Sequence, residues 1–246
     1  MKINENTFFS GMTTDEYLAQ IKVNKQPFLD IYASVEIPDV YTSYLESLDE
    51  SLKLVAFAAD WCGDHLTTSP PILRLSQATD RLEARVFDSD LHKEMTNSFL
   101  PENRWNTVPV FVVFDSCMNE VCRFIETSND LVPELDAMES IVINQHVTST
   151  GENSGDNDII QESQISMRGG RTAIRVANAR EWGTTVLHSF VQIIKEGLAL
   201  SEADRPQSTQ YKWNSIPSPL QRIKFCRIQV LGYYKFPEML LSTFTI

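Results

Sequence analysis

An apolar segment that runs directly into Trp-Cys-Gly-Asp constrains this chain more than any other feature. Residues 54–59 are all apolar, which is typical of a strand buried on both faces of a sheet. A helix is expected to follow over residues 62–78. A cysteine at such a junction faces the free amides of the first helical turn, and these favour its thiolate. The sequence therefore predicts an α/β protein with Cys62 as a candidate nucleophile at the end of a buried strand.

The rest of the chain alternates helical and extended patterns. Thr13 and Glu16 have the spacing of a capping box, so we expect a helix over 14–33 that Pro27 breaks or kinks. The later expected elements are a helix at 38–48, a strand at 83–88, a short helix at 91–100, strands at 108–114 and 120–125 that form a hairpin, and helices at 130–146 and 172–199.

Composition excludes several classes of partner. The net charge of −12 over 246 residues argues against nucleic acid and anionic membrane surfaces, because phosphates would repel the chain. The sequence has no apolar run long enough to span a bilayer, and its N-terminus does not read as a secretory signal. The 4 cysteines lack the dense spacing of a disulfide scaffold, so we expect a reducing compartment, the cytoplasm.

Two prolines extend the pattern around the cysteine. Pro70 lies eight residues after Cys62, and Thr107-Val108-Pro109 lies at the start of the expected strand at 108–114. Together with Trp61-Cys62-Gly63, this arrangement resembles the thioredoxin-like family, in particular a bacterial branch with Trp-Cys-Gly-Asp sites. The resemblance covers about residues 50–146. It implies a three-layer α/β fold with a central mixed sheet, an N-terminal helical extension, and a C-terminal helix followed by an irregular tail.

We divide the chain into four segments on this basis. Residues 1–50 are the helical extension, 51–146 the thioredoxin-like domain, 147–166 a flexible linker and 167–246 the C-terminal helix and tail. The linker is polar and carries acidic but no basic residues, which is typical of a segment that does not order itself. Four arginines then crowd the start of the next helix, and we expect them to face solvent or to pair with acidic groups, with anion or nucleic-acid contact as the alternative: Arg168, Arg171, Arg175 and Arg180.

The resemblance also assigns roles at the site. It implies that Cys62 is the nucleophile and that Trp61, Gly63, Val108 and a cis Pro109 form the groove that binds substrate. His65 stands where these proteins carry the resolving cysteine, and we expect it to lower the pKa of the thiol when protonated or to act as a neutral base.

A second departure from the family pattern lies in the strand, because Ala56 occupies the place of the buried carboxylate. Both groups that would resolve an internal disulfide are thus replaced. Asp60 and Asp64 bracket the motif, and we expect Asp60 to cap the helix and Asp64 to complement its dipole. Cys117 and Cys122 flank the hairpin turn far from Cys62 and are expected to be reduced, with a bridge between them as the alternative, and Cys226 stays open as a resolving thiol.

Three functions are consistent with these residues. The first is a monothiol thiol–disulfide oxidoreductase of cell redox homeostasis, with no cofactor and no metal. Its Cys62 thiolate attacks a protein or small-molecule disulfide or mixed disulfide, and an external thiol resolves the adduct. The second is a non-catalytic scaffold that binds partners through the Trp61/Pro109 groove. The third uses Cys62 and His65 as one edge of a zinc or iron–sulfur site. His92, His146 and His188 receive no role, and the sequence does not indicate an oligomeric state.

Overall fold

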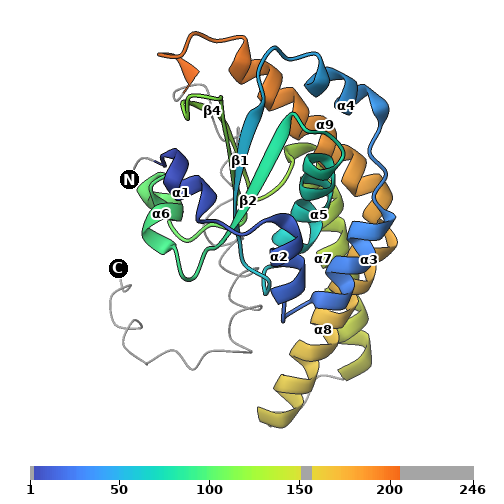
Figure 1. Ribbon diagram of the computed structural model, residues 1–246. Helices are drawn as coiled ribbons and strands as arrows, with labels where there is room; N and C mark the ends of the chain where they lie inside the picture. The colour runs from blue at the N-terminus through green and yellow to red at the C-terminus, as the bar shows by residue number, and fades with distance from the viewer. Residues whose placement is uncertain (1–2, 151–156, 206–246) are drawn as a thin grey trace.

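A four-stranded mixed sheet lies at the centre of the computed structural model, which describes residues 3–150 and 157–205 (Figure 1). Its strands are β1 (Leu52–Ala58), β2 (Leu82–Asp88), β3 (Val110–Phe114) and β4 (Glu120–Ile125), in the order β2-β1-β3-β4. β1 and β2 are parallel, whereas β3 is antiparallel to both β1 and β4. This sheet, with helices around it, matches the thioredoxin-like architecture expected from the sequence.

Nine helices of the described residues surround the sheet. They are α1 (Glu5–Phe9), α2 (Thr14–Gln20), α3 (Lys25–Ser34), α4 (Asp39–Glu46), α5 (Gly63–Gln77), α6 (Lys93–Asn97), α7 (Val132–Thr150), α8 (Asn157–Ala177) and α9 (Ala179–Leu198), with short 3-10 turns at Glu102–Arg104 and Asn129–Leu131. None of the helices in this part of the chain is both long and apolar enough to cross a membrane.

Two expected helices are each divided in two. The capping box of Thr13 and Glu16 is present, but the helix ends at Gln20, and Asn24 then takes a left-handed conformation with φ 58°. Pro27 therefore lies in the first turn of α3, where a missing N–H is tolerated. The expected helix over 172–199 is also two helices, which meet at Asn178.

The expected flexible linker at 147–166 is largely helical instead. Residues 147–150 complete α7 and residues 157–166 begin α8, so these two helices form a hairpin. α8 contacts α3, α5 and α7, and sequence composition does not report such contacts between distant segments. Residues 151–156 and the expected tail from Lys212 lie outside the described residues.

Alternating side chains of the strands build two cores, one on each face of the sheet. Leu54 and Ala56 of β1 face the core formed with α3, α5 and α9, whereas Val55 and Phe57 face the core formed with α1 and α6. Figure 1 shows the resulting three layers, with α1 and α6 on one side of the sheet and α5 and α9 on the other.

The larger core is completed by a helix from beyond residue 146, the end of the expected thioredoxin-like segment. α9 packs on both α5 and β4, and its Trp182, Val186 and Phe190 are buried there. A Cβ at Gly197 would lie 2.3 Å from the carbonyl oxygen of Val121, so glycine is what allows α9 to approach β4 this closely. The expected segment at 51–146 therefore shares one hydrophobic core with α9, which lies beyond its end.

Candidate active site

Cys62 is the N-cap residue of α5, at the point where β1 ends and the helix begins. Its backbone is extended, and its amide donates to the carbonyl oxygen of Ala59 at 3.0 Å. The amides of the first turn of an α-helix have no partner inside the helix and carry the positive end of its dipole. The sulfur thus lies where a thiolate is electrostatically favoured.

The loop before β3 forms the opposite wall of the site. The Val108–Pro109 peptide bond is cis, and the Cys62 thiol donates to the carbonyl oxygen of Val108 with a sulfur–oxygen distance of 3.4 Å. Val110 is the register partner of Phe57, which explains why the start of β3 meets the end of β1 beside the motif. Cys62 is only 3% exposed in this arrangement.

Trp61 and Gly63 complete the group of residues that the sequence predicted to lie together. Trp61 packs against the cluster of Ala59, Cys62 and Val108, and its indole N–H donates to the Asp90 carboxylate at 2.8 Å. Gly63 is buried in the first turn of α5. The structure therefore brings Trp61, Cys62, Gly63, Val108 and Pro109 to one end of the sheet.

His65 takes a different place from the one expected, because it is turned away from solvent and is 1% exposed. Its Nε2 lies 2.5 Å from the Tyr17 hydroxyl and its Nδ1 lies 2.6 Å from the Ser69 hydroxyl. The ring also stacks on Phe28, with centroids 5.2 Å apart. Each ring nitrogen is therefore hydrogen-bonded to one hydroxyl.

Burial determines the charge of His65. It lowers the pKa of the imidazole to about 3, so the ring is neutral at physiological pH. Burial likewise raises the pKa of Tyr17, which keeps its hydroxyl protonated. A protonated His65 as the group that favours the thiolate is thus the wrong expectation, and a metal ion would have to displace one of the two hydroxyls to bind a ring nitrogen.

Asp60 also differs from its expected role. Its carboxylate does not cap α5 but accepts hydrogen bonds from the amides of Lys22 and Val23, at 3.0 and 2.9 Å. The Asn24 side chain donates to the Asp60 carbonyl at 2.9 Å. The residue before the motif therefore fixes the connection between α2 and α3, which is the physical reason for the break in the expected helix over 14–33. Asp64 does lie in the first turn of α5.

Arg175 of α8 is the residue at this site that sequence reasoning missed. It is 5% exposed, its Nε donates to the Thr67 hydroxyl at 3.0 Å, and its Nη2 lies 4.0 Å from the Asp64 carboxylate. Burial lowers the pKa of the guanidinium, whereas the charges of Asp64, Glu139 and Cys62 act to raise it. The sequence does contain a signal for this residue, because the spacing of Arg168, Arg171 and Arg175 places them on one face of a helix.

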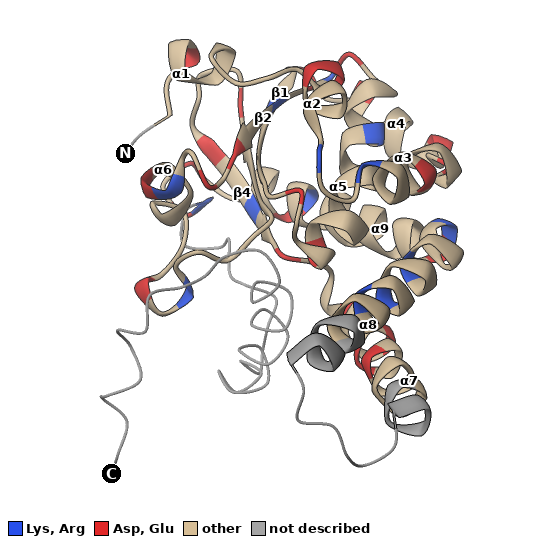
Figure 2. Ribbon diagram, turned by 90° about the horizontal axis from the view of Figure 1, so that it is seen from below, with Lys and Arg blue, Asp and Glu red and all other residues tan. Residues whose placement is uncertain are grey.

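Arg171 lies one turn before Arg175 and is also buried. Its guanidinium donates to both oxygens of Glu139 on α7, at 2.6 and 2.8 Å. Figure 2 shows the basic residues of α8 beside acidic residues of α7. The expected pairing with acidic groups is confirmed for Arg171, Arg175 and Arg180, but the first two are enclosed rather than exposed to solvent.

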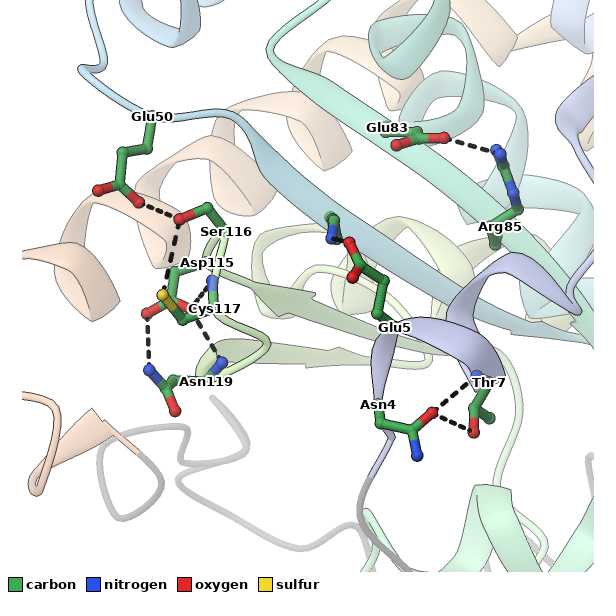
Figure 3. Close-up of polar contacts among 11 residues, drawn as sticks. Asn4, Glu5, Thr7, Glu50, Glu83, Arg85, Asp115, Ser116, Cys117 and Asn119 are labelled. Atoms are coloured by element: carbon green, nitrogen blue, oxygen red, sulfur yellow. Dashed lines mark hydrogen bonds and ion pairs between the residues drawn. The ribbon is translucent and has the colours of Figure 1, made fainter.

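The other described cysteines lie away from the site. Cys117 is exposed in the turn between β3 and β4, where the Asp115 carboxylate accepts from the amides of Cys117 and Asn119 (Figure 3). This turn is at the far end of β3 from Val108, at least about 13 Å along the strand. Cys122 is buried, and burial raises the pKa of its thiol. Both thiols are free, as expected, and Cys226 lies outside the described residues.

Possible metal ligands elsewhere in the described residues are a separate question. Across residues 3–150 and 157–205, no group of three or more His, Cys, Asp or Glu side chains has the arrangement of a metal site.

A family model described as Thioredoxin matches residues 11–139, which is more than half of the 246 residues. The chain therefore belongs to the thioredoxin family. No curated protein matches it at a significant level.

A solved structure agrees on the fold. A crystal structure of a protein of unknown function from Pseudomonas aeruginosa superimposes with a TM-score of 0.54 at 12% sequence identity, over 79% of this chain and 98% of that one. An HIV epitope-scaffold gives a TM-score of 0.49 at 14% identity, over 79% of this chain and 99% of that one. At such identities the first likeness describes the fold alone.

Proposed function

We propose that this protein is a thiol–disulfide oxidoreductase that works with a single thiol, Cys62. The observation that carries the proposal is the position of that thiol at the N-terminus of α5, 3.4 Å from the Val108 carbonyl oxygen of the loop that contains the cis proline. Membership of the thioredoxin family supports a redox role. A helix N-terminus lowers the pKa of a cysteine thiol and so increases the fraction of the nucleophilic thiolate.

The reaction consists of two exchanges. The Cys62 thiolate attacks one sulfur of a substrate disulfide, so that a Cys62–substrate disulfide forms and the second substrate sulfur leaves as a thiolate. An external thiolate then attacks the substrate sulfur of this adduct, which releases the Cys62 thiolate and leaves the substrate disulfide-bonded to the external thiol. No net oxidant or reductant is consumed beyond the exchanging thiols.

The substrates in this proposal are disulfides or mixed disulfides of proteins or small thiols. Trp61, Gly63, Val108 and Pro109 bind them, and the partly buried Trp61 forms one wall of the groove. The free thiols of Cys117 and Cys122 are consistent with a reducing compartment, in which we place the protein, the cytoplasm. The net charge of −12 disfavours nucleic acid and anionic membranes as partners.

His65 has a structural role in this proposal. Its neutral ring is hydrogen-bonded to Tyr17 of α2 and to Ser69 of α5, and these bonds hold α2 against the first turns of α5. It does not move a proton during exchange.

The decisive experiment is the capture of a mixed disulfide. The protein is incubated with an activated aromatic disulfide, and the rate of release of the aromatic thiol is followed together with the mass of the adduct. We expect one adduct on Cys62 and its loss in Cys62→Ser, whereas Cys117→Ser, which removes an exposed thiol, keeps it. A rate at Cys62 no faster than that at Cys117 would contradict the proposal.

One observation favours the scaffold as a second candidate function. Cys62 is only 3% exposed, and a binding module needs no access to its sulfur. If the groove binds a partner without exchange, Cys62→Ser keeps the affinity while Trp61→Ala lowers it. An oxidoreductase instead shows a partner that is covalently trapped and released by a reducing agent.

His65→Cys tests whether the groove can still bind and reduce a protein disulfide. Residues three apart on a helix have Cβ atoms about 5–6 Å apart, so modest adjustment at the helix start is enough to close a disulfide with Cys62. We expect this variant to form that internal disulfide and to reduce a protein disulfide without an external resolving thiol. A variant that closes the disulfide but reduces nothing would favour the scaffold.

A further inference from the structure

An arginine from outside the segment matched to the family reaches the motif helix. The family match ends at residue 139, whereas Arg175 belongs to α8. Its guanidinium is enclosed between α8 and the first turns of α5. Arginine keeps its proton even when buried, because its unperturbed pKa is above 12. A permanent positive charge is thus placed beside the turn that begins at Cys62.

The hydrogen bonds of Arg175 direct this charge toward the start of α5. Nε donates to Thr67, and the Thr67 hydroxyl donates in turn to the carbonyl oxygen of Gly63 at 3.2 Å, in the residue next to Cys62. Glu139 is bound through both of its oxygens by Arg171, so Arg175 does not have to neutralise it. Asp64, at 4.0 Å, is a partly exposed counter-ion.

The carboxylates, the histidine and the tyrosine near Cys62 do not favour its thiolate. Asp60 and Asp64 lie on either side of the motif, Asp88 is the last residue of β2, and Asp90 follows it at the same end of the sheet. These carboxylates repel a thiolate. His65 is neutral, and Tyr17 is protonated. A buried thiol in such surroundings resists ionisation unless a cation compensates it.

We propose that Arg175 is a positioning residue of the site and that its guanidinium stabilises the thiolate of Cys62. The α7–α8 hairpin thus contributes a residue to the thioredoxin-family site. This inference rests on the proposed function for its purpose, because a stabilised thiolate serves the exchange reaction. It goes beyond that function in naming the electrostatic partner that substitutes for the neutral His65.

The test is a pH titration of the Cys62 thiolate by its ultraviolet absorbance, taken as the difference between each protein and its Cys62→Ser counterpart. We expect Arg175→Gln to raise the titration midpoint by about one pH unit or more, as loss of a nearby opposite charge does. Arg175→Lys, which keeps a cation, should retain most of the original midpoint. An unchanged midpoint in folded Arg175→Gln overturns the proposal.

A matched control separates electrostatics from a general disturbance of α8. The double variant R171Q/E139Q removes a buried pair one turn earlier without a change in net charge. Its midpoint should stay at the wild-type value, and a rise as large as that in Arg175→Gln would assign the effect to the packing of α8. If Arg175→Gln does not fold, Thr67→Val replaces it, since valine has the shape of threonine and removes the acceptor of Arg175 Nε. It should shift the midpoint in the same direction by a smaller amount, and no shift overturns the proposal.

The titration needs no substrate, so its outcome is distinct from that of the exchange assay. A midpoint that rises in Arg175→Gln, in a protein that forms no mixed disulfide, keeps the role of Arg175 and removes the proposed function. Exchange at Cys62, together with an unchanged midpoint in Arg175→Gln, keeps the proposed function and removes the role of Arg175.

Discussion

The two flanks of the first turns of α5 differ in charge, although both are buried and both receive side chains from distant parts of the chain. On one flank, His65 lies among two hydroxyls and the ring of Phe28, and every group is neutral. On the other flank, Thr67 and Asp64 meet the guanidinium of Arg175. His65 and Thr67 are two residues apart, which on a helix places them about 200° around the axis.

This difference shows how one helix serves structure and chemistry at the same time. The neutral flank anchors the N-terminal helices, because α2 and α3 supply Tyr17 and Phe28. The charged flank anchors the α7–α8 hairpin and presents a cation to the motif. A titratable residue placed at the motif by sequence alone, such as His65, is thus not necessarily the one that controls the charge there.

The largest effect is expected on the charged flank, from breaking the buried pair of Arg171 and Glu139. Their side chains are 4% and 8% exposed, so Glu139→Ala leaves a guanidinium without its counter-ion. We expect a loss of about 3–5 kcal/mol in the free energy of unfolding, measured by urea denaturation. Replacing both by apolar residues, R171M/E139L, should restore most of it. A loss in the double variant equal to that in the single one would mean that the charges themselves are required.

On the neutral flank, Tyr17→Phe removes the hydroxyl that faces His65 Nε2. A buried polar atom left without a partner costs about 1–3 kcal/mol of unfolding free energy. Tyr32→Phe is the matched control, because the Tyr32 hydroxyl bonds Gln77 at an exposed position and water replaces the lost partner. Equal losses in the two variants would indicate that burial of the His65 contact contributes nothing.

The neutral flank also predicts a pH dependence of stability. The pKa of His65 is about 3 in the folded protein, against about 6.5 in an unfolded chain. Between these values the unfolded state binds a proton that the folded state does not, so stability is complete above about pH 6.5 and falls as the pH decreases. At pH 5.5 this group alone should cost about 1.4 kcal/mol relative to neutral pH.

Comparison of urea midpoints at pH 5.5 and 7.5 for the wild type and His65→Gln isolates this contribution. The variant should lose about 1.4 kcal/mol less on acidification. The same loss in both proteins would show that His65 is protonated in the fold.

The smallest effect is expected where the charges are exposed. Arg180 and Glu36 form an ion pair whose side chains are 70% and 66% exposed. Arg180→Gln should change the free energy of unfolding by less than about 1 kcal/mol. Thermal denaturation at low and high salt checks this. A loss comparable to that of Glu139→Ala would show that α9 needs this pair to dock.

The fold was readable from the sequence where local patterns decide it. The strands and the Val108–Pro109 loop were placed correctly from three patterns. These are the apolar run before the motif, the β-branched run before the turn at Asp115, and the two prolines. The capping box at Thr13 and the hairpin were also recoverable, because they depend on residues a few positions apart.

The environment of the motif was not readable, because its partners are distant in sequence. Tyr17 lies 48 residues before His65, and Arg175 lies 108 residues after Thr67. No periodicity connects such pairs. Asp60 was assigned to the nearest helix, yet its carboxylate binds amides 37 and 38 residues away. Burial of this kind decides whether a histidine is charged, and it becomes known only once the packing is known.

The position of α8 and α9 late in the chain has a consequence for synthesis on the ribosome. All four strands are translated by residue 125, but α9, which completes the cover that α3 and α5 begin on one face of the sheet, ends only at Leu198, and Arg175 is made just before α9 starts. During this interval the growing chain holds a paired sheet with part of that apolar face uncovered, and such a surface is a substrate for chaperones. Cys62 meanwhile has no guanidinium beside it. On the role proposed for Arg175, the thiol acquires its full reactivity only after α8 docks, so a half-made chain is protected from premature disulfide exchange.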